Sequence, residues 1–272
     1  MHALDKTVLT TSAQTEPGHA FIKHVGAVEK HCRVEQRAVF ADLDWPHLRQ
    51  WEDGATAQGL TWERYAGRVP RDVLVALLPV FTELLADVPL GELETGPIRW
   101  EMNGYDLWYQ TLERVGGAHH LVLLRAPDGG VIGLSEAAWD VRAPGIVRQQ
   151  LTAVARPWRS RGVGRALKAA MLRQVHELHP EATIIGTNNA EVNAPILSIN
   201  ARVGFKIALA QRGLSGDSGG VGFMGGWLCT SNEYHVESVE IGTQSALSWR
   251  MTQMQWNGRV RKTAPAAVVR FG

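Results

Sequence analysis

Cysteine is scarce in this chain. Only Cys32 and Cys229 occur among its 272 residues, and they form no CxxC pair. Structural zinc sites and disulfide frameworks need paired or clustered cysteines, so the sequence argues against both. His119 and His120 are adjacent, and neighbouring residues of a strand point to opposite faces. We therefore expect no metal site.

Charge of one sign and long apolar runs are also missing. The chain carries 28 Lys and Arg against 27 Asp and Glu, a balance that gives no field to attract nucleic acid. Its longest apolar runs, such as residues 73–78, fall far short of the ~20 residues that span a bilayer. Residues 1–20 lack the charged and apolar regions of a secretory signal. We expect no nucleic-acid or membrane partner and a cytoplasmic location.

The residues that are present predict both helices and strands, and from residue 148 on their order of strand, helix, strand, helix, strand is an α/β arrangement. Apolar spacing with acidic, proline or glycine boundaries predicts helices at 45–59, 71–88, 106–115, from the glycines at 162–164 to Pro180, and at 191–202. Strands are expected at 33–40, 119–126, 131–140, 148–155, 182–187 and from residue 204. Most of the ten tryptophans are expected in the core, because each buries a large area.

Composition divides the chain into three parts. Residues 33–211 carry the predicted helices and strands, and residues 1–32 form an N-terminal arm. Residues 212–272 are rich in glycine and show no clear periodicity. Disorder, added strands and a non-native sequence all stay open for this tail.

The segment R-S-R-G-V-G at residues 159–164 lies between a predicted strand and a predicted helix. Glycines there let the backbone approach a ligand, and the first turn of a helix presents free N–H groups and a positive dipole end. Arg159, Arg161 and Arg165 add charge that suits a phosphorylated ligand. The segment is predicted to bind a pyrophosphate, and the alternative is a tight turn that packs the helix on the sheet.

The same segment differs from the dinucleotide-binding motif G-x-G-x-x-G, because residue 167 is leucine, and it lacks the G-K-[ST] of a P-loop. It resembles the signature [QR]-x-x-G-x-[GA] of the GNAT superfamily of N-acetyltransferases. Residues 188–205, NNAEVNAPILSINARVGF, resemble the next helix of that family, with its internal asparagine and terminal G-F. The resemblance covers about residues 34–211. It implies a mixed, largely antiparallel central sheet flanked by helices.

The resemblance also implies acetyl-CoA as co-substrate and direct attack of a primary amine, from a small molecule or a peptide, on its thioester. By position, Thr152, Ala153 and Val154 would lie along the pantetheine arm, and Asn193 would hydrogen-bond the cofactor unless it is a helix cap or surface amide. A homodimer stays open. The residues implied for the pyrophosphate are Arg159, Ser160, Arg161, Gly162, Val163, Gly164 and Arg165.

This chemistry needs a base for the amine and an acid for the departing thiolate. Glu136 is the candidate base, directly or through a water, with Asp140 as the second choice. A solvent-facing strand residue is the alternative interpretation of Glu136. At the acid position, where the family often has the tyrosine of Y-x-x-x-G-F, this chain has Asn200. An amide donates no proton at neutral pH, so solvent or another group has to protonate the thiolate.

Two other functions are open. A GNAT-shaped acyl-CoA-binding or regulatory module with weak catalysis is consistent with Asn200. G-D-S-G-G at residues 216–220 matches the nucleophile segment of serine proteases and makes Ser218 a remote hydrolase candidate, although that fold needs paired cysteines and two β-barrels. Residues 19–31 faintly resemble the end of another GNAT domain, as in tandem members, which would make residues 1–32 its remnant.

Overall fold

The computed structural model describes residues 8–13, 15–24, 26, 28–86, 101–217 and 239–240. The chain divides into two compact units. The larger unit comprises His31–Gln211 with Thr243–Trp249, and the smaller comprises Met1–Lys30, Arg212–Gly242 and Arg250–Gly272. The domain boundaries expected from composition stay predictions. Ser218, the remote hydrolase candidate, lies outside the described residues.

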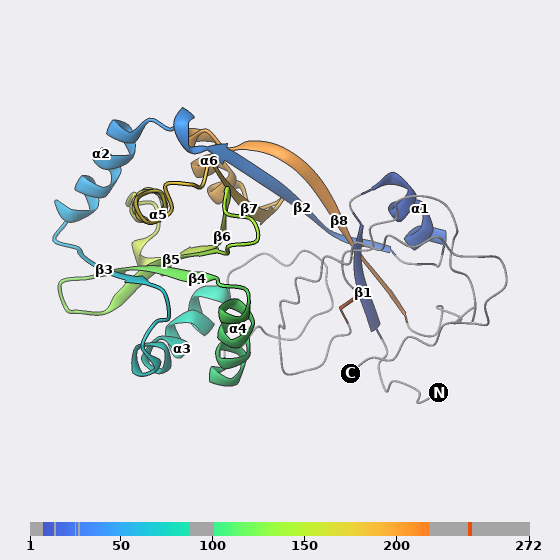
Figure 1. The fold of residues 1–272 in the computed structure, drawn as a ribbon, viewed down its shortest axis with the longest axis horizontal. Helices are drawn as coiled ribbons and strands as arrows, with labels where there is room; N and C mark the ends of the chain where they lie inside the picture. Colours follow the sequence, from blue (N-terminus) through green and yellow to red (C-terminus); the bar gives the residue numbers. More distant parts are fainter. Residues whose placement is uncertain are drawn as a thin grey trace. The chain divides into compact units, whose positions relative to one another are not determined.

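The larger unit contains both helices and strands (Figure 1). In chain order they are β2 (Val28–Val39), α2 (Trp45–Thr56), β3 (Thr61–Ala66), α3 (Arg71–Leu85), α4 (Met102–Arg114), β4 (Ala118–Arg125), β5 (Val131–Trp139), β6 (Ile146–Val154), α5 (Val163–Leu178), β7 (Ile184–Ala190), α6 (Ala194–Val203) and β8 (Lys206–Asp217). Residues 28–30 of β2 and 212–217 of β8 belong to the smaller unit. Short 3-10 turns lie at Phe40–Asp42 and Arg156–Trp158.

The strands of the larger unit form one sheet in the order β3-β4-β5-β6-β7-β2-β8. The pairs β3–β4, β4–β5, β5–β6 and β2–β7 are antiparallel, whereas β6–β7 is parallel. Helices α2 and α5 lie on one side of the sheet, and α3 and α4 lie on the other (Figure 1). The structure thus confirms the expected α/β fold with a mixed, largely antiparallel sheet flanked by helices.

All helices and strands expected between residues 33 and 205 are present, with ends that differ by a few residues. Strand β3 is absent from the sequence prediction. It lies at the edge of the sheet, and its four central residues are only partly buried. Its sequence TWERYA therefore lacks the apolar alternation by which a half-buried strand is recognised.

Local signals explain where the helices of the larger unit begin and end. Asp44 precedes α2, and its Oδ1 accepts a hydrogen bond of 3.0 Å from the backbone N–H of His47. This is the usual capping contact for a first helical turn. At the end of α6, Gly204 adopts a φ of 105° directly after the last helical residue. Glycine tolerates that left-handed conformation, so the helix ends there.

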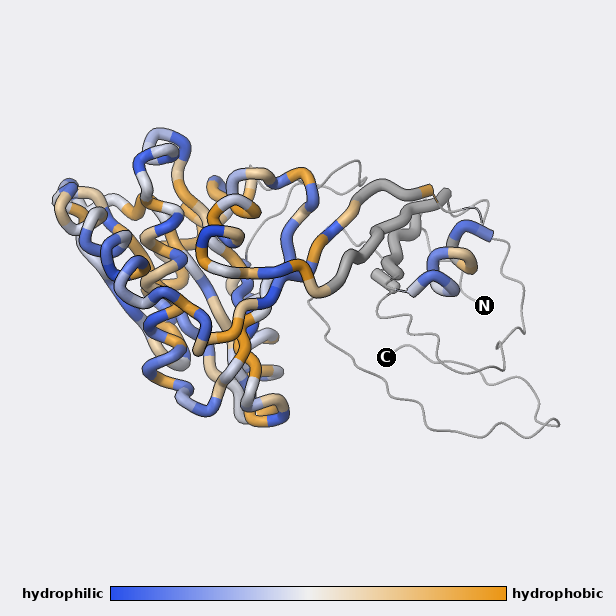
Figure 2. Tube along the Cα trace, turned by 90° about the horizontal axis from the view of Figure 1, so that it is seen from above, coloured by the Kyte–Doolittle hydropathy of each residue, from blue (hydrophilic) through white to orange (hydrophobic). Residues whose placement is uncertain are grey.

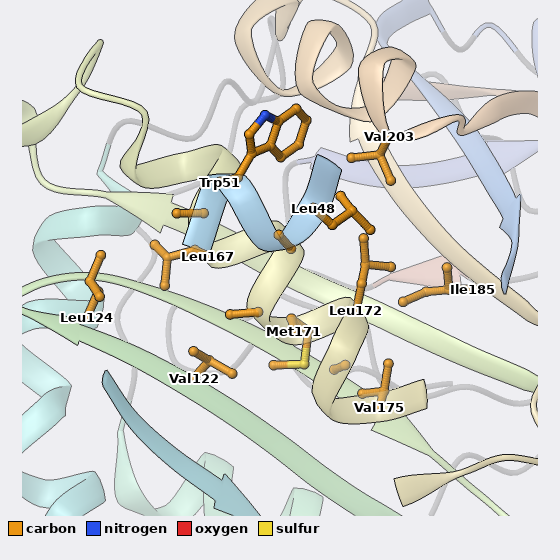
Figure 3. Close-up of a cluster of buried hydrophobic side chains, with 14 of the residues drawn as sticks. Leu48, Trp51, Val122, Leu124, Leu167, Met171, Leu172, Val175, Ile185 and Val203 are labelled. Atoms are coloured by element: carbon orange, nitrogen blue, oxygen red, sulfur yellow. The ribbon is translucent and has the colours of Figure 1, made fainter. Parts of the chain in front are cut away.

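Two apolar layers hold the helices on the sheet. In the layer between α2, α5 and the sheet, Leu48 and Trp51 of α2 lie near Leu167 and Met171 of α5, above Val122 of β4 (Figure 3). The layer under α3 and α4 includes Leu74, Phe81, Tyr105, Tyr109, Leu121, Leu123 and Leu134. Hydropathy accordingly alternates along the helices of this unit (Figure 2), as expected for helices with one buried face.

The smaller unit contains β1 (Val8–Ala13), α1 (Glu16–His24) and β9 (Val239–Glu240). Strand β1 pairs antiparallel with residues 212–217 of β8 and with β9. The start of the glycine-rich tail is therefore a strand. Apart from residues 239 and 240, the tail beyond residue 217 lies outside the described residues.

Candidate functional site

Strands β6 and β7 separate part of the way along their length. Their parallel pairing runs from Ile146, opposite Ile184, to Gln149, opposite Thr187. Strand β6 continues to pair with β5 as far as Val154. Residues 150–154 therefore have no β7 partner, and one edge of β6 lies beside β7 without a strand paired to it. We call this part of the sheet the strand fork.

A β-bulge lies at the start of the strand fork. Glu136 of β5 is opposite Leu151 and Ala137 is opposite Gln149, so Gln150 is the extra residue of β6. Such a bulge shifts the alternation of side chains by one position. As a result Gln149 and Thr152 point to the same face, where the Gln149 Nε2 donates to the Thr152 Oγ1 at 3.0 Å.

The loop that follows β6 contains two residues with a left-handed backbone conformation. Gly162, with a φ of 83°, is the residue before α5, and Ser160 has a φ of 60°. Gly162 provides no side-chain cap for the helix. Within the described residues, the backbone N–H groups of 160–165 donate no hydrogen bond. These groups and the positive end of the α5 dipole are available to an anionic ligand.

Arginine side chains surround this loop. Arg161 lies over the ring of Trp158, with 5.0 Å from its Cζ to the ring centroid, and Arg165 lies 5.8 Å from the ring of Trp51. Arg159 Nε donates to the Val154 carbonyl at 2.9 Å. All three arginines are exposed. The first two can therefore form cation–π contacts with tryptophan at the surface.

The remaining implied cofactor residues lie at the same place. Val163 is buried, and a Cβ atom on Gly164 would lie 3.4 Å from the Ile199 Cδ1 and 3.6 Å from the Val154 Cγ2. These are ordinary contact distances, so α5 lies beside both α6 and β6 at Gly164. Thr152, Ala153 and Val154 form the edge of the fork. Asn193 directly precedes α6, and its side chain makes no capping hydrogen bond.

Glu136 lies on the face of the sheet covered by α3 and α4. Its side chain is buried, so the solvent-facing interpretation is wrong. The Tyr105 hydroxyl of α4 donates to the Glu136 Oε1 at 3.2 Å, and the His119 Nε2 lies 3.2 Å from the same oxygen without alignment for a hydrogen bond. His119 Nδ1 is 2.8 Å from the Tyr109 hydroxyl. Burial raises the pKa of Tyr109 to about 12, so this phenol stays protonated.

Asp140 is held in ion pairs. Its Oδ1 is 3.0 Å from the Arg142 Nε and its Oδ2 is 3.2 Å from the Arg148 Nη1. The hydrogen bonds from Arg142 are the main reason that the pKa of Asp140 lies below its usual value. A carboxylate so paired is a weak proton acceptor. The geometry therefore favours Glu136 over Asp140 as the base.

Asn200 lies inside the protein, between α6 and β2. Its side chain is fully buried, and its Nδ2 donates to the Gln36 Oε1 at 2.7 Å. The Asn200 Oδ1 is buried without a hydrogen-bond partner. Asn200 is thus a buried amide that is hydrogen-bonded to β2. It carries no acidic proton, so nothing in its surroundings supports a role as an acid.

The structure brings together residues that sequence reasoning did not connect. Tyr105 and His119 contact Glu136 from α4 and β4. His119 and His120 point to opposite faces of β4, as expected. On the face opposite to His119, the His120 Nε2 lies 2.8 Å from the Nε2 of His179, the residue after α5. The described residues contain no group of three metal-binding side chains, and none of their helices is long and apolar enough to cross a membrane.

Comparisons with known proteins bear on the fold. No protein-family model and no curated protein matches the chain. A tandem GNAT protein from the clavulanic acid biosynthesis pathway is similar in structure, with 21% identity and a TM-score of 0.58. The match covers 78% of this chain and 65% of that protein's chain. A GCN5-related N-acetyltransferase from Sphaerobacter thermophilus matches 79% of this chain and 62% of its own, at 14% identity and a TM-score of 0.54.

The chain spans less than two thirds of the length of either of these structures. At such identities, structural likeness establishes the fold, and function has to be argued from the site. The chain has the fold of the GNAT acetyltransferases.

Proposed function

We propose that this chain is an acetyl-CoA-dependent N-acetyltransferase that acts on a primary amine of a small molecule or peptide. The junction of β6 and α5 supports the proposal most directly. A free strand edge at residues 150–154 leads into a loop with free N–H groups at 160–165. Coenzyme A presents its groups in the same order, an arm with two amides and then a pyrophosphate.

The residues present fit such a ligand. The free edge of β6 offers N–H and C=O groups to the amides of the pantetheine arm, as one strand does to another. The N–H groups of 160–165 and the guanidinium groups of Arg161 and Arg165 would hold the pyrophosphate. Asn193 stays a candidate contact because its side chain caps nothing in α6.

Bound acetyl-CoA would supply a thioester carbonyl to the amine of the acceptor. Glu136 would accept the proton that the amine nitrogen loses as the C–N bond forms. Tyr105 and His119 would fix the orientation of the Glu136 carboxylate through their contacts with its Oε1. Because Glu136 faces α3 and α4, the acceptor would approach from that side of the sheet. Neither nucleic acid nor a membrane enters the proposal.

A second candidate is an acyl-CoA-binding or regulatory module with weak catalysis. The exposed fraction of Glu136 is only 2%, and Asn200 is directed inward to Gln36. A base so deeply buried serves catalysis only if the acceptor reaches it. The two candidates share the cofactor site and differ in turnover.

Calorimetric titration with acetyl-CoA tests the cofactor site. Replacement of both Arg161 and Arg165 by Gln should weaken binding at least about tenfold, since charge-assisted hydrogen bonds contribute about 1.5–3 kcal/mol each. Arg114→Gln, an exposed arginine at the end of α4, is the matched control and should bind as the unmodified chain does. A chain that binds no acetyl-CoA would refute both candidates.

A thiol-release assay with amines, aminoglycosides and peptides then separates the candidates. Turnover of any acceptor establishes the transferase. Tight binding of acetyl-CoA without release of free thiol across the panel favours the binding module.

A further inference from the structure

Lys168 is a buried lysine on α5, and the described part of the chain offers it no counter-ion. Its side chain is 1% exposed, and within the described residues it forms no ion pair or hydrogen bond. Its Nζ lies 4.3 Å from the centroid of the Phe205 ring, which offers a cation–π contact. Burial lowers the pKa of Lys168 to about 7. A buried amine with so little compensation lowers stability, so its presence calls for a role.

The position of Lys168 follows from its neighbours on α5. Gly164 lies one turn earlier on the same face of the helix, against Val154 of β6 and Ile199 of α6. Leu167 packs on the sheet, because a Cβ atom on Gly133 would lie 2.7 Å from the Leu167 Cδ1 and 2.9 Å from the Ala153 carbonyl oxygen. Lys168 therefore lies one turn beyond Gly164 on α5, and its Nζ is directed toward Phe205, which follows the end of α6.

Lys168 and Glu136 belong to opposite sides of the sheet at the strand fork. Glu136 faces α4 through Tyr105, whereas Lys168 lies between α5 and Phe205. In the proposed function the arm of acetyl-CoA runs along β6, so side chains from both sides of the sheet would be able to meet it at the fork. The nucleophile and its base would then lie on one side of the sheet, and the leaving sulfur would lie on the side of α5 and α6.

Expulsion of a thiolate is easier when a proton donor lies beside the sulfur. Asn200 cannot fill that role, since its amide carries no acidic proton and its Nδ2 is engaged with Gln36. The arginines of the loop hold their protons too tightly to give them up. Lys168 is a titratable side chain buried on the correct side of the sheet.

We infer that Lys168 donates the proton to the sulfur of the departing thiolate. This inference rests on the proposed function and identifies its acid. As the amine nitrogen bonds to the carbonyl carbon, the C–S bond breaks, Glu136 takes the proton of the nitrogen, and Lys168 Nζ gives a proton to the sulfur. Glu136 then releases its proton to solvent and Lys168 regains one, so the protein ends the cycle unchanged.

Calorimetry with coenzyme A and desulfo-coenzyme A tests the contact between Lys168 and sulfur without an acceptor. The two ligands differ only in the thiol. Near pH 7, where Lys168 is about half protonated, a hydrogen bond between its Nζ and the sulfur should make the unmodified chain bind coenzyme A about tenfold more tightly than the desulfo ligand. In Lys168→Met this difference should disappear while binding of desulfo-coenzyme A is unchanged. Lys206→Met, an exposed lysine one residue beyond Phe205, should keep the difference.

An equal preference for the thiol in the unmodified chain and in Lys168→Met would overturn the inference. Failure of the unmodified chain to bind either ligand would instead overturn the proposed function. Thermal unfolding monitored by circular dichroism shows whether Lys168→Met is folded. If it is not, Lys168→Gln replaces it in the same titrations. Once an acceptor is known, Lys168→Met should lower kcat about 10²-fold or more, leave the KM for acetyl-CoA unchanged, and remove the alkaline limb of the kcat–pH profile.

Discussion

The Tyr105 hydroxyl of α4 donates a hydrogen bond of 3.2 Å to the Glu136 Oε1 of β5. Both side chains are buried, and the His119 Nε2 lies 3.2 Å from the same oxygen. Burial, followed by the nearby carboxylate, raises the pKa of Tyr105, so its hydroxyl keeps its proton. The carboxylate of Glu136 is therefore held at one oxygen by a permanent donor, an arrangement that suits a base with a fixed orientation.

Glu136→Gln should lower kcat by about 10²–10⁴-fold with any acceptor that is turned over, because general-base catalysis contributes about that much. Tyr105→Phe removes only the orienting hydrogen bond and should cost about tenfold. Steady-state kinetics with saturating acetyl-CoA measures both. Glu113→Gln, an exposed glutamate of α4, is the control. An equal loss of kcat in all three variants would point to damage of α4 and its surroundings rather than to loss of the base.

The loop at residues 159–165, which we call the anion loop, could be predicted from the sequence because its signals are local. Glycines and arginines at residues 159–165 lie between a strand and a helix, and Gly162 and Ser160 do adopt the left-handed conformations that the loop needs. The strand fork could not be predicted from the sequence. It arises because the pairing of β6 and β7 stops at Gln149 and Thr187, and register between segments far apart in the chain leaves no mark on either one.

The surroundings of Glu136 show the same limit. Its strand reads as a half-exposed hairpin strand, yet β5 is covered on both faces, and the residues on either side of Glu136 are buried. Tyr105 comes from a helix whose apolar spacing predicts a buried face but does not tell which strand that face meets. Lys168 stands among apolar residues of α5, but nothing in the sequence marks its side chain as buried, and its burial is seen only in the structure.

The paired histidines His120 and His179 should make stability depend on pH. Their Nε2 atoms are 2.8 Å apart, and burial lowers the pKa of His120 to about 3. Between that value and the unfolded value of about 6.5, the unfolded chain binds the extra proton, so stability falls as the pH falls through this window. Urea unfolding at steps of pH should show the loss, and His120→Leu should reduce its slope. The exposed His47→Gln should keep the slope of the unmodified chain.

Two neighbouring glycines of the anion loop should respond oppositely to alanine. Gly162 has a φ of 83°, so Gly162→Ala should destabilise the chain by about 1–2 kcal/mol. A Cβ atom on Gly164 would make only ordinary contacts at 3.4 and 3.6 Å. Gly164→Ala should therefore be neutral or stabilise by up to about 1 kcal/mol, because alanine favours the helix. Chemical denaturation measures both, and equal losses would contradict the assigned backbone conformations.

Lys168→Met should stabilise the chain near neutral pH. Because the folded pKa of Lys168 is about 7 and the unfolded value is 10.5, the unfolded chain binds more protons across that range, and stability should rise with pH from 7 to 10.5. Methionine fills similar space without a charge, so the variant should gain at least about 1 kcal/mol at pH 7 and lose this pH dependence. Urea unfolding at both ends of the range measures the effect, with Lys206→Met as the exposed control. A stabilising substitution that also abolishes the thiol preference would indicate that the buried amine is kept for its chemistry at the expense of stability.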